Sequence, residues 1–307
     1  MIRRALFVSF LAVFACVGRA NAMLVYERSA SHAIVAARDD GSHATVLAHG
    51  SAPAVAPDGR HVIFLANTGR VYPDLRIVGV HGGRSRLLLR YAYVDTQNAA
   101  KGWSPNSRYV VTGNGASGAA ILIDLAHKSN RLFPRDDSSY VDASFAPDSS
   151  LVAFADPGDR SPDKIVVRDI YGHRTRRVAT GDSPVWGGGG LAYTAPAGIK
   201  RKTQLNQPAE LLLSAGSSNY LYPVSWSKHG RRLLAARGPR QDQLQALLIA
   251  PATHDLMTLP QTFSEVDALS RNGKLILGVV GGNVVTVRAD GTMRTLAHGA
   301  VNATWTR

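Results

Sequence analysis

The chain has 307 residues, a formal net charge of +13 and an apolar fraction of 45%. This apolar fraction is typical of a folded globular protein and argues against a disordered chain. Beyond the N-terminus, no apolar run reaches the roughly 18 residues that a membrane helix needs. The single cysteine, Cys16, excludes a disulfide within the chain. The excess of positive charge favours anionic partners.

The N-terminus has the three parts of a secretory signal peptide. MIRR supplies the positive charge, residues 5–17 form an apolar run, and Ala20 to Ala22 make a small-residue cleavage site. We expect residues 1–22 to be a signal peptide, the mature chain to begin at Met23, and the protein to be periplasmic or secreted, with no transmembrane span after signal removal. Two alternatives remain, a retained anchor helix and, as a minor one, lipid anchoring at Cys16.

A short motif returns along the chain: a large apolar residue, a tight turn and an alternating apolar run. The seven large residues, 36 to 48 positions apart, are Val55, Trp103, Phe145, Trp186, Trp226, Leu269 and Trp305. Each interval is predicted to contain short strands separated by Gly, Asn, Asp and Pro. Four short strands per repeat of this length is the pattern of a β-propeller blade.

The two ends of the chain complement each other. Three strands are predicted at 24–28, 32–37 and 44–50 with no large residue before them, and the chain ends on a strand at 301–307. Pairing the two ends would close the ring and remove exposed sheet edges. We therefore predict an all-β fold, a seven-bladed β-propeller of four-stranded antiparallel blades, closed by the C-terminal strand joining the N-terminal blade.

The repeat resembles that of TolB-like propellers. The resemblance rests on turns such as Trp103-Ser104-Pro105-Asn106 and Phe145-Ala146-Pro147-Asp148, each followed by a β run, and it covers 23–307. Relatives with this repeat include periplasmic protein-binding modules, non-catalytic propellers attached to serine peptidases, and oligogalacturonate lyases. The chain has no G-x-S-x-G hydrolase motif, and Gly187 to Gly190 depart from the repeat. We expect the tryptophans to be core residues between blades.

The meander places turns after the first and third strands on one side of the disc, and those turns are rich in Arg and Lys. We call this side the basic face; its binding candidates are Arg84, Arg86, Arg174, Arg176, Arg177, Arg231 and Arg232. Single cations on turns are ordinary, so the prediction rests on their one-sidedness. Such a face would bind an anionic surface, and less well in high salt.

The opposite side, which we call the funnel side, carries the segments that enter the inner strands. Its binding candidates are Lys101, Asp142, Asp182, Tyr222, Glu265, Asp267, Asn302, His49 and His298. The acids could hold a divalent cation in the central channel, or cap turns and pair with nearby cations. A long basic loop, 195–210, is also expected on this side, between the second and third strands of its repeat. No motif identifies a metal site or a catalytic residue.

These features predict an exported, non-catalytic, monomeric interaction scaffold that uses the basic face and the funnel. Its partner would be another envelope protein or an anionic glycan or surface, and nucleic acid is disfavoured by the export signal. The alternative is a carbohydrate-active propeller, similar to polysaccharide lyases, with an anionic sugar as substrate and a metal in the funnel. In that case His49 or His298, with Lys101 and the funnel acids, would be the candidate catalytic groups.

Overall fold

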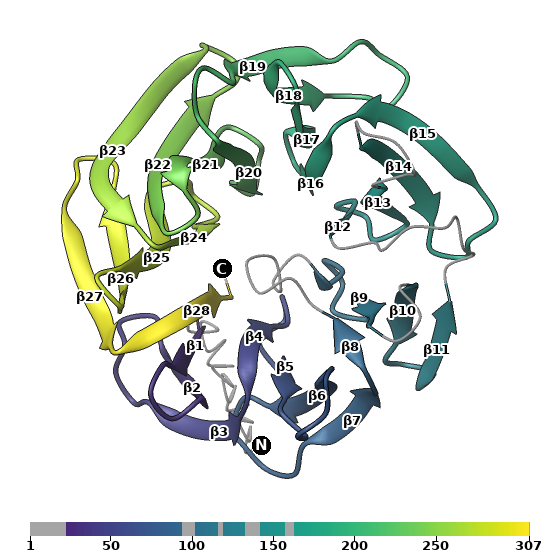
Figure 1. Cartoon of the computed structure of the whole chain (residues 1–307), viewed down its shortest axis with the longest axis vertical. Helices are drawn as coiled ribbons and strands as arrows, with labels where there is room; N and C mark the ends of the chain where they lie inside the picture. The colour runs from purple at the N-terminus through teal and green to yellow at the C-terminus, as the bar shows by residue number, and fades with distance from the viewer. Residues whose placement is uncertain (1–22, 94–101, 116–118, 133–141, 157–162, 307) are drawn as a thin grey trace, which may run out of the picture.

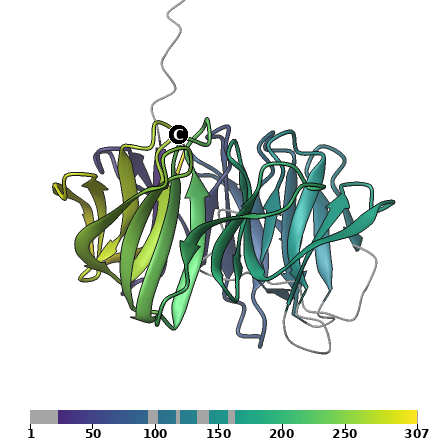
Figure 2. The ribbon, with the colours of Figure 1, turned by 90° about the horizontal axis from the view of Figure 1, so that it is seen from above.

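The computed structural model describes residues 23–93, 102–115, 119–132, 142–156 and 163–306. These residues form 28 strands in seven four-stranded antiparallel sheets. The sheets are arranged as blades around a central axis (Figure 1), and the molecule is a disc when it is seen from its edge (Figure 2). Nowhere in these ranges does a helix occur that is long and apolar enough to cross a membrane. The predicted signal peptide and Lys101 lie outside the described residues.

Blades are numbered from the N-terminus, and their strands are given from the inside outwards. Blade 1 contains β28 (Ala300–Trp305), β1 (Met23–Arg28), β2 (Ala33–Arg38) and β3 (Thr45–His49). Blade 2 contains β4 (Ser51–Val55), β5 (His61–Ala66), β6 (Asp74–Gly79) and β7 (Arg86–Leu89). Blade 3 contains β8 (Ala92–Tyr93), β9 (Tyr109–Asn114), β10 (Ala120–Asp124) and β11 (Ser129–Leu132). Blade 4 contains β12 (Ala143–Phe145), β13 (Leu151–Asp156), β14 (Lys164–Asp169) and β15 (Thr175–Thr180).

The last three blades complete the ring. Blade 5 contains β16 (Asp182–Gly187), β17 (Gly190–Ala195), β18 (Gly198–Lys202) and β19 (Glu210–Ser214). Blade 6 contains β20 (Tyr220–Trp226), β21 (Leu233–Arg240), β22 (Gln243–Ala250) and β23 (Asp255–Phe263). Blade 7 contains β24 (Glu265–Leu269), β25 (Leu275–Val280), β26 (Asn283–Arg288) and β27 (Met293–His298).

The predicted fold and its closure are confirmed. β28 pairs antiparallel with β1, from Leu24 opposite Trp305 to Arg28 opposite Ala300, so the C-terminal strand is the inner strand of the N-terminal blade. Every strand therefore belongs to a sheet of a closed ring, and the blades protect one another's faces.

The core is divided into seven apolar clusters, and each one fills the junction between two neighbouring blades. At the junction of blades 2 and 3, the buried Trp103 donates its Nε1 hydrogen to the carbonyl of Ala54 at 3.0 Å. Trp226 does the same to Val185 at the junction of blades 5 and 6, at 3.2 Å. These two tryptophans are core residues, as expected, and their one polar atom is satisfied by the preceding blade.

The glycine run of blade 5 has a packing reason. A Cβ on Gly187 or Gly189 would lie 2.6 or 2.3 Å from atoms of the Trp226 side chain, closer than real contacts allow. The indole of blade 6 therefore lies directly against this turn of blade 5. The departure from the repeat at Gly187 to Gly190 is explained by this close approach.

The prediction of a long basic loop at 195–210 is wrong in its boundaries. Residues Gly198–Lys202 form β18, the third strand of blade 5, and β19 takes the outermost place. Ile199 is the one large apolar residue of β18, and three cationic residues follow it. The sequence of this strand therefore lacks the alternation of apolar and polar residues by which a strand is recognised. The loop that remains, 203–209, follows a third strand and so lies on the basic face rather than on the funnel side.

Candidate functional site

The funnel-side candidates lie on or beside inner strands, but the acids form two separate groups. Glu265 and Asp267 are on β24, next to Asn302 on β28. Asp182 opens β16, and Asp142 directly precedes β12. Tyr222, on β20, packs against the apolar cluster of blades 6 and 7. Among the described residues, no three metal-ligating side chains come together in a way that could hold an ion.

A network of hydrogen bonds joins the first group across the seam where the ring closes. The backbone N–H of Asn302 donates to Glu265 Oε2 at 2.7 Å, and the Asn302 side chain donates to Glu27 Oε2 at 2.8 Å. The Ala52 N–H also donates to Glu27 Oε2, and the His32 ring contacts Oε1 at 2.7 Å. The network therefore connects blades 7, 1 and 2.

Glu27 was not among the predicted residues, although its side chain is the centre of this network and is only 3% exposed. It lies on β1, the second strand of its blade, whereas the prediction considered only positions close to the inner strands. The one available signal was an acidic residue within the apolar run LVYER, where a charge is expected to be buried only with partners.

The acids support a bulge that recurs in the inner strands. Ala52, Ser183 and Asn302 each stand three positions before the large residue of their strand, and each has a positive φ, between 48° and 51°. At each of these residues the register between the inner strand and the second strand of the blade shifts. Such a backbone is strained for a side-chain-bearing residue.

At each bulge, an acid of the preceding blade supplies an acceptor. Glu27 accepts from the Ala52 N–H, Glu265 from the Asn302 N–H, and Asp142 from the Ser183 hydroxyl at 3.2 Å. This structural use of Asp142, Glu265 and Asn302 corresponds to the turn-capping alternative of the sequence analysis.

Burial makes several of these acids hard to ionise. It raises the pKa of Glu265, and the nearby charge of Glu27 raises it further. The pKa of Asp267 is raised well above its usual value by burial and then by Glu265, although Asp267 accepts a hydrogen bond from the backbone of Ala303. Its Oδ2 atom is buried and has no hydrogen-bond partner within the part of the chain that the structure describes. Burial also raises the pKa of Asp182, with the charge of Asp142 acting in the same direction.

The two histidines proposed as funnel groups lie far from these acids. His49 ends β3 and His298 ends β27, both outermost strands, and both side chains are exposed. His298 contacts Asn283 at 3.1 Å. An outermost and an innermost strand are three strand spacings apart, about 14 Å at about 4.8 Å per spacing. The structure therefore does not bring these histidines to the acids of the inner strands.

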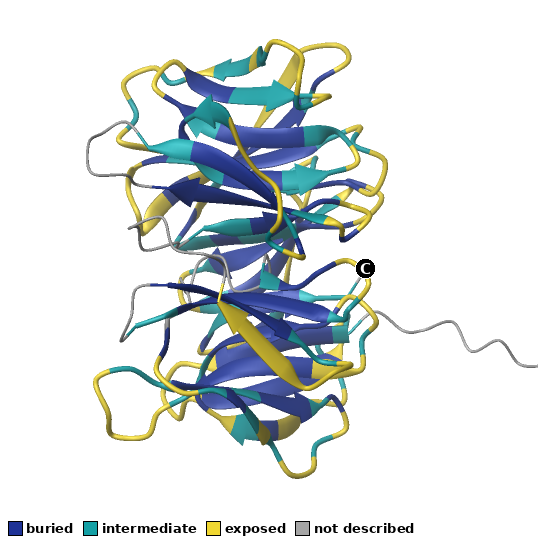
Figure 3. Ribbon diagram, turned by 90° about the vertical axis from the view of Figure 1, so that its right-hand side faces the viewer, coloured by how far each residue is buried: buried dark blue, intermediate teal, exposed yellow. Residues whose placement is uncertain are grey.

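The basic-face candidates fall into two sets. The C-terminus, where β28 ends, lies on one face of the disc (Figures 2 and 3). Arg84, Arg174 and Arg231 are exposed on turns after first or third strands, which belong to that face. Arg86, Arg176 and Arg177 are on β7 and β15, outermost strands, and so lie at the rim of the disc. Arg232 is half-buried and donates to the carbonyl of Gly273 in the next blade at 2.8 Å. This arginine therefore also joins two blades.

The face carries two carboxylates that sequence reasoning overlooked, at the ends of third strands. Asp124 accepts two hydrogen bonds from Arg108, at 3.1 and 2.8 Å, and contacts His127. The Arg108 guanidinium holds the pKa of Asp124 well below its usual range. Asp169 accepts from three backbone N–H groups of the turn that carries Arg174. These two carboxylates offset part of the positive charge of the face, and each accepts hydrogen bonds from the backbone of the turn that follows it.

Solved structures with the same fold include TolB and several enzymes, whereas neither a family model nor a curated protein matches the sequence. TolB from Acinetobacter baumannii is similar over 93% of this chain and 66% of its own, with 14% identity and a TM-score of 0.59. An oligogalacturonate lyase in complex with manganese is similar over 89% and 83%, with 11% identity and a TM-score of 0.61.

A prolyl endopeptidase is similar over 92% of this chain, with 12% identity and a TM-score of 0.64. The chain spans half the length of that peptidase and just under two thirds of TolB. At such identities the similarity establishes the fold alone, because one fold supports many functions. The resemblance to TolB-like propellers expected from the repeat is thereby confirmed at the level of the fold.

Proposed function

We propose that the protein is a non-catalytic interaction scaffold that holds an acidic partner protein of the cell envelope against its basic face. The observation that supports this is the display of exposed cations on turns whose backbones are held by hydrogen bonds. Arg174 is on the turn capped by Asp169, and Arg231 is on the turn closed by the Gly230 N–H to the Ser227 carbonyl at 2.9 Å. Cations held in this way bind an anionic surface with little loss of backbone freedom.

The funnel acids contribute differently in this proposal. Glu27, Glu265 and Asp142 already accept hydrogen bonds from neighbouring blades, so we assign them to the integrity of the ring. The envelope location follows from the predicted signal peptide and is part of the proposal.

A crosslinked pull-down from a periplasmic extract, with 23–307 as bait, tests the proposal at low and high salt. The test variant replaces Arg84, Arg174 and Arg231 by Glu. The matched control replaces Arg90 and Arg240 by Glu, two exposed arginines on the funnel side. We expect a protein that is captured at low salt, is reduced at high salt, is lost with the test variant and is retained by the control.

Two results would overturn the proposal. A protein captured equally by the test variant would show that the basic face does not bind it. Capture of an anionic glycan with no protein would show that the partner is a glycan and not a protein.

A further inference from the structure

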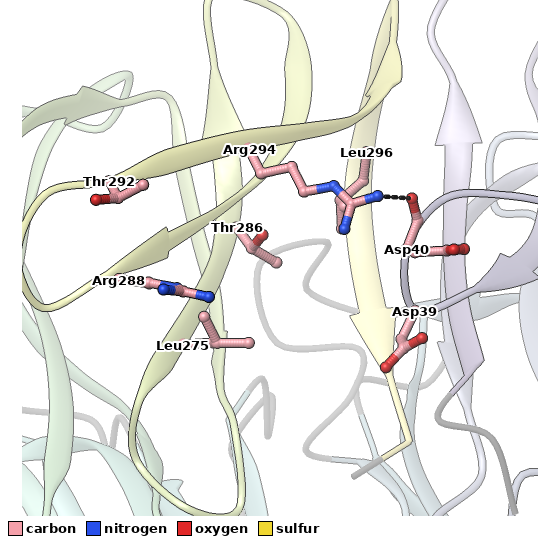
Figure 4. A pocket seen from close by; sticks show the side chains of 8 residues that line it. All are labelled: Asp39, Asp40, Leu275, Thr286, Arg288, Thr292, Arg294 and Leu296. Atoms are coloured by element: carbon pink, nitrogen blue, oxygen red, sulfur yellow. Dashed lines mark hydrogen bonds between the residues drawn. The ribbon is translucent and has the colours of Figure 1, made fainter.

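Two adjoining clefts cross the end of blade 7 on the basic face, and we call them together the blade-7 groove. The cleft towards blade 1 has a volume of about 440 Å³ and is shown in Figure 4. The cleft towards blade 6 has a volume of about 600 Å³. Leu275 and Arg288, which pair within blade 7, line both, so the two clefts adjoin at these residues. A groove of this size on a rigid disc suits a short extended chain.

The two ends of the groove differ in their charged residues. Its blade-6 end is lined by Arg232, Lys274 and Arg288, with Asp290 at the edge. Its blade-1 end is lined by Asp39 and Asp40 together with Arg288 and Arg294 of blade 7, and Arg294 points to the backbone carbonyl of Asp40 (Figure 4). One end of the groove is therefore mainly cationic, and the other presents carboxylates.

The cationic end is held in place by contacts between blades. Arg232 donates to the carbonyl of Gly273, on the turn before Lys274, at 2.8 Å. Gln261 of β23 donates to the carbonyl of Gly291, on the turn that carries Asp290, at 2.7 Å. Asp290 itself accepts the N–H of Thr292 at 2.8 Å. The turns of blade 7 are thus fixed to blade 6.

The acidic end is held equally closely. Gly41, which follows Asp40, has φ +82°, and a Cβ there would lie 2.2 Å from the carbonyl oxygen of Leu296 on β27. Arg294 donates to the carbonyl of Asp40 at 3.3 Å, and the Ser42 N–H donates to the Asp40 carboxylate at 2.9 Å. Only glycine permits this close approach, so the turn with both acids is fixed against blade 7.

We propose that the blade-7 groove binds an extended peptide segment that places acidic side chains over Arg232, Lys274 and Arg288 and a cationic group beside Asp39 and Asp40. This proposal rests on the proposed function and names the site and partner chemistry on the basic face. A peptide can carry both signs of charge in sequence, and Leu275 and Leu296 provide apolar contacts for its side chains. A uniformly anionic glycan would meet the two carboxylates at the blade-1 end, where like charges repel.

Fluorescence anisotropy with labelled peptides at physiological salt tests the groove. The probes are a peptide with three Glu, a Gly-Gly spacer and three Lys, the same peptide in reverse order, and a peptide with six Glu around the spacer. We expect one of the two mixed orders to bind at least about tenfold more tightly than the all-acidic peptide, a ratio typical of a few charge pairs.

Three variants connect the binding to the groove. Lys274→Glu with Arg288→Glu should weaken binding of the mixed peptide about tenfold or more. Asp39→Asn with Asp40→Asn should remove the preference and let the all-acidic peptide bind as well as the mixed one. Arg240→Glu, at the end of β21 on the funnel side, is the control and should leave both affinities unchanged.

Any of three results would overturn the proposal that the blade-7 groove binds such a peptide. These are equal binding of mixed and all-acidic peptides, an equal loss of binding with Arg240→Glu, or tighter binding of a sulfated oligosaccharide that the Lys274 and Arg288 substitutions abolish. The pull-down separates this failure from failure of the proposed function. A partner still captured by the Lys274 and Arg288 variant, but lost with the Arg84, Arg174 and Arg231 variant, would leave the scaffold standing and reject the groove.

Discussion

The two sides of the disc use charge in opposite ways. On the funnel side, Glu27, Glu265 and Asp142 are drawn into hydrogen bonds with the strained bulges of the next blade. On the basic face, Arg84, Arg174 and Arg231 are exposed on fixed turns. A buried charge is compatible with a stable fold only where it is paired, whereas an exposed charge contributes little to stability and remains available to a partner. Charge on the funnel side should therefore determine stability, and charge on the basic face should determine binding.

The largest effect is expected at Glu27. Glu27→Ala leaves the Ala52 N–H and the Asn302 amide without their acceptor, so we expect a loss of about 2–4 kcal/mol in the free energy of unfolding. Urea denaturation at neutral pH measures this loss. Arg174→Ala is the matched control on the other side and should change stability by less than about 0.5 kcal/mol. Equally small changes in the free energy of unfolding at Glu27 and Arg174 would contradict the proposed difference between the two sides of the disc.

A gain in stability is expected at Asp267. Because its pKa is raised in the folded state, the folded protein binds the proton more tightly than the unfolded chain does, and stability falls as pH rises through the folded pKa. Asp267→Asn removes the cost of burying an ionisable carboxyl, whether it is ionised or protonated, so it should stabilise the protein by about 1–2 kcal/mol at pH 7. Below the unfolded pKa, at about pH 3.5, this advantage should vanish.

Thermal unfolding of both proteins across this pH range measures the difference. A variant that is less stable than the native protein at pH 7 would show that the Asp267 carboxylate has a stabilising partner.

Asp124 should show the opposite pH dependence with a smaller effect. Its pKa is lowered in the folded state by Arg108, so its contribution is present above the unfolded pKa and is lost as pH falls through the folded value. Arg108 is partly exposed, and we expect Asp124→Asn to lower stability by about 1 kcal/mol at pH 7. Chemical denaturation at pH 7 and pH 3 should show the difference shrinking in acid; a constant difference would point to packing rather than charge.

The smallest effect on stability is expected on the basic face itself. Replacing Arg84, Arg174 and Arg231 singly by Glu should change the free energy of unfolding by less than about 0.5 kcal/mol each, because these side chains are exposed. Arg232→Glu should cost more, since the Arg232 guanidinium binds the Gly273 carbonyl. Thermal unfolding of the four variants side by side checks this order, and a large loss at Arg174 or Arg231 would assign them a structural role.

The fold could be predicted because its determinants repeat. Trp103 and Trp226 recur with their turns at a regular interval, and the unmatched ends of the chain implied closure by β28. Lys200 to Lys202 could not be placed, because β18 has one buried apolar residue and so no visible alternation. β18 is recognisable as a strand only in the folded sheet, where it pairs with β17 on one side and β19 on the other.

The site was harder to predict, because it depends on contacts between distant residues. Closeness to the inner strands selected Asp142, Glu265 and Asn302, which the structure places in hydrogen bonds between blades, but it omitted Glu27, which reaches the seam from a second strand. The same rule placed the acids around one axis, whereas the structure separates them into two groups on opposite sides of the ring (Figure 1). The position of a residue along the chain shows at which end of a strand it lies, but it does not show in which direction its side chain points.

Lysine crosslinking followed by mass spectrometry of the captured complex tests most directly whether the partner binds the basic face. Lys128, Lys228 and Lys274 are exposed on turns of that face, and Lys164 begins β14 on the funnel side. We expect crosslinks from the partner to Lys228 and Lys274 and none to Lys164. Crosslinks concentrated at Lys164, with none on the basic face, would contradict this expectation and place the partner over the funnel acids.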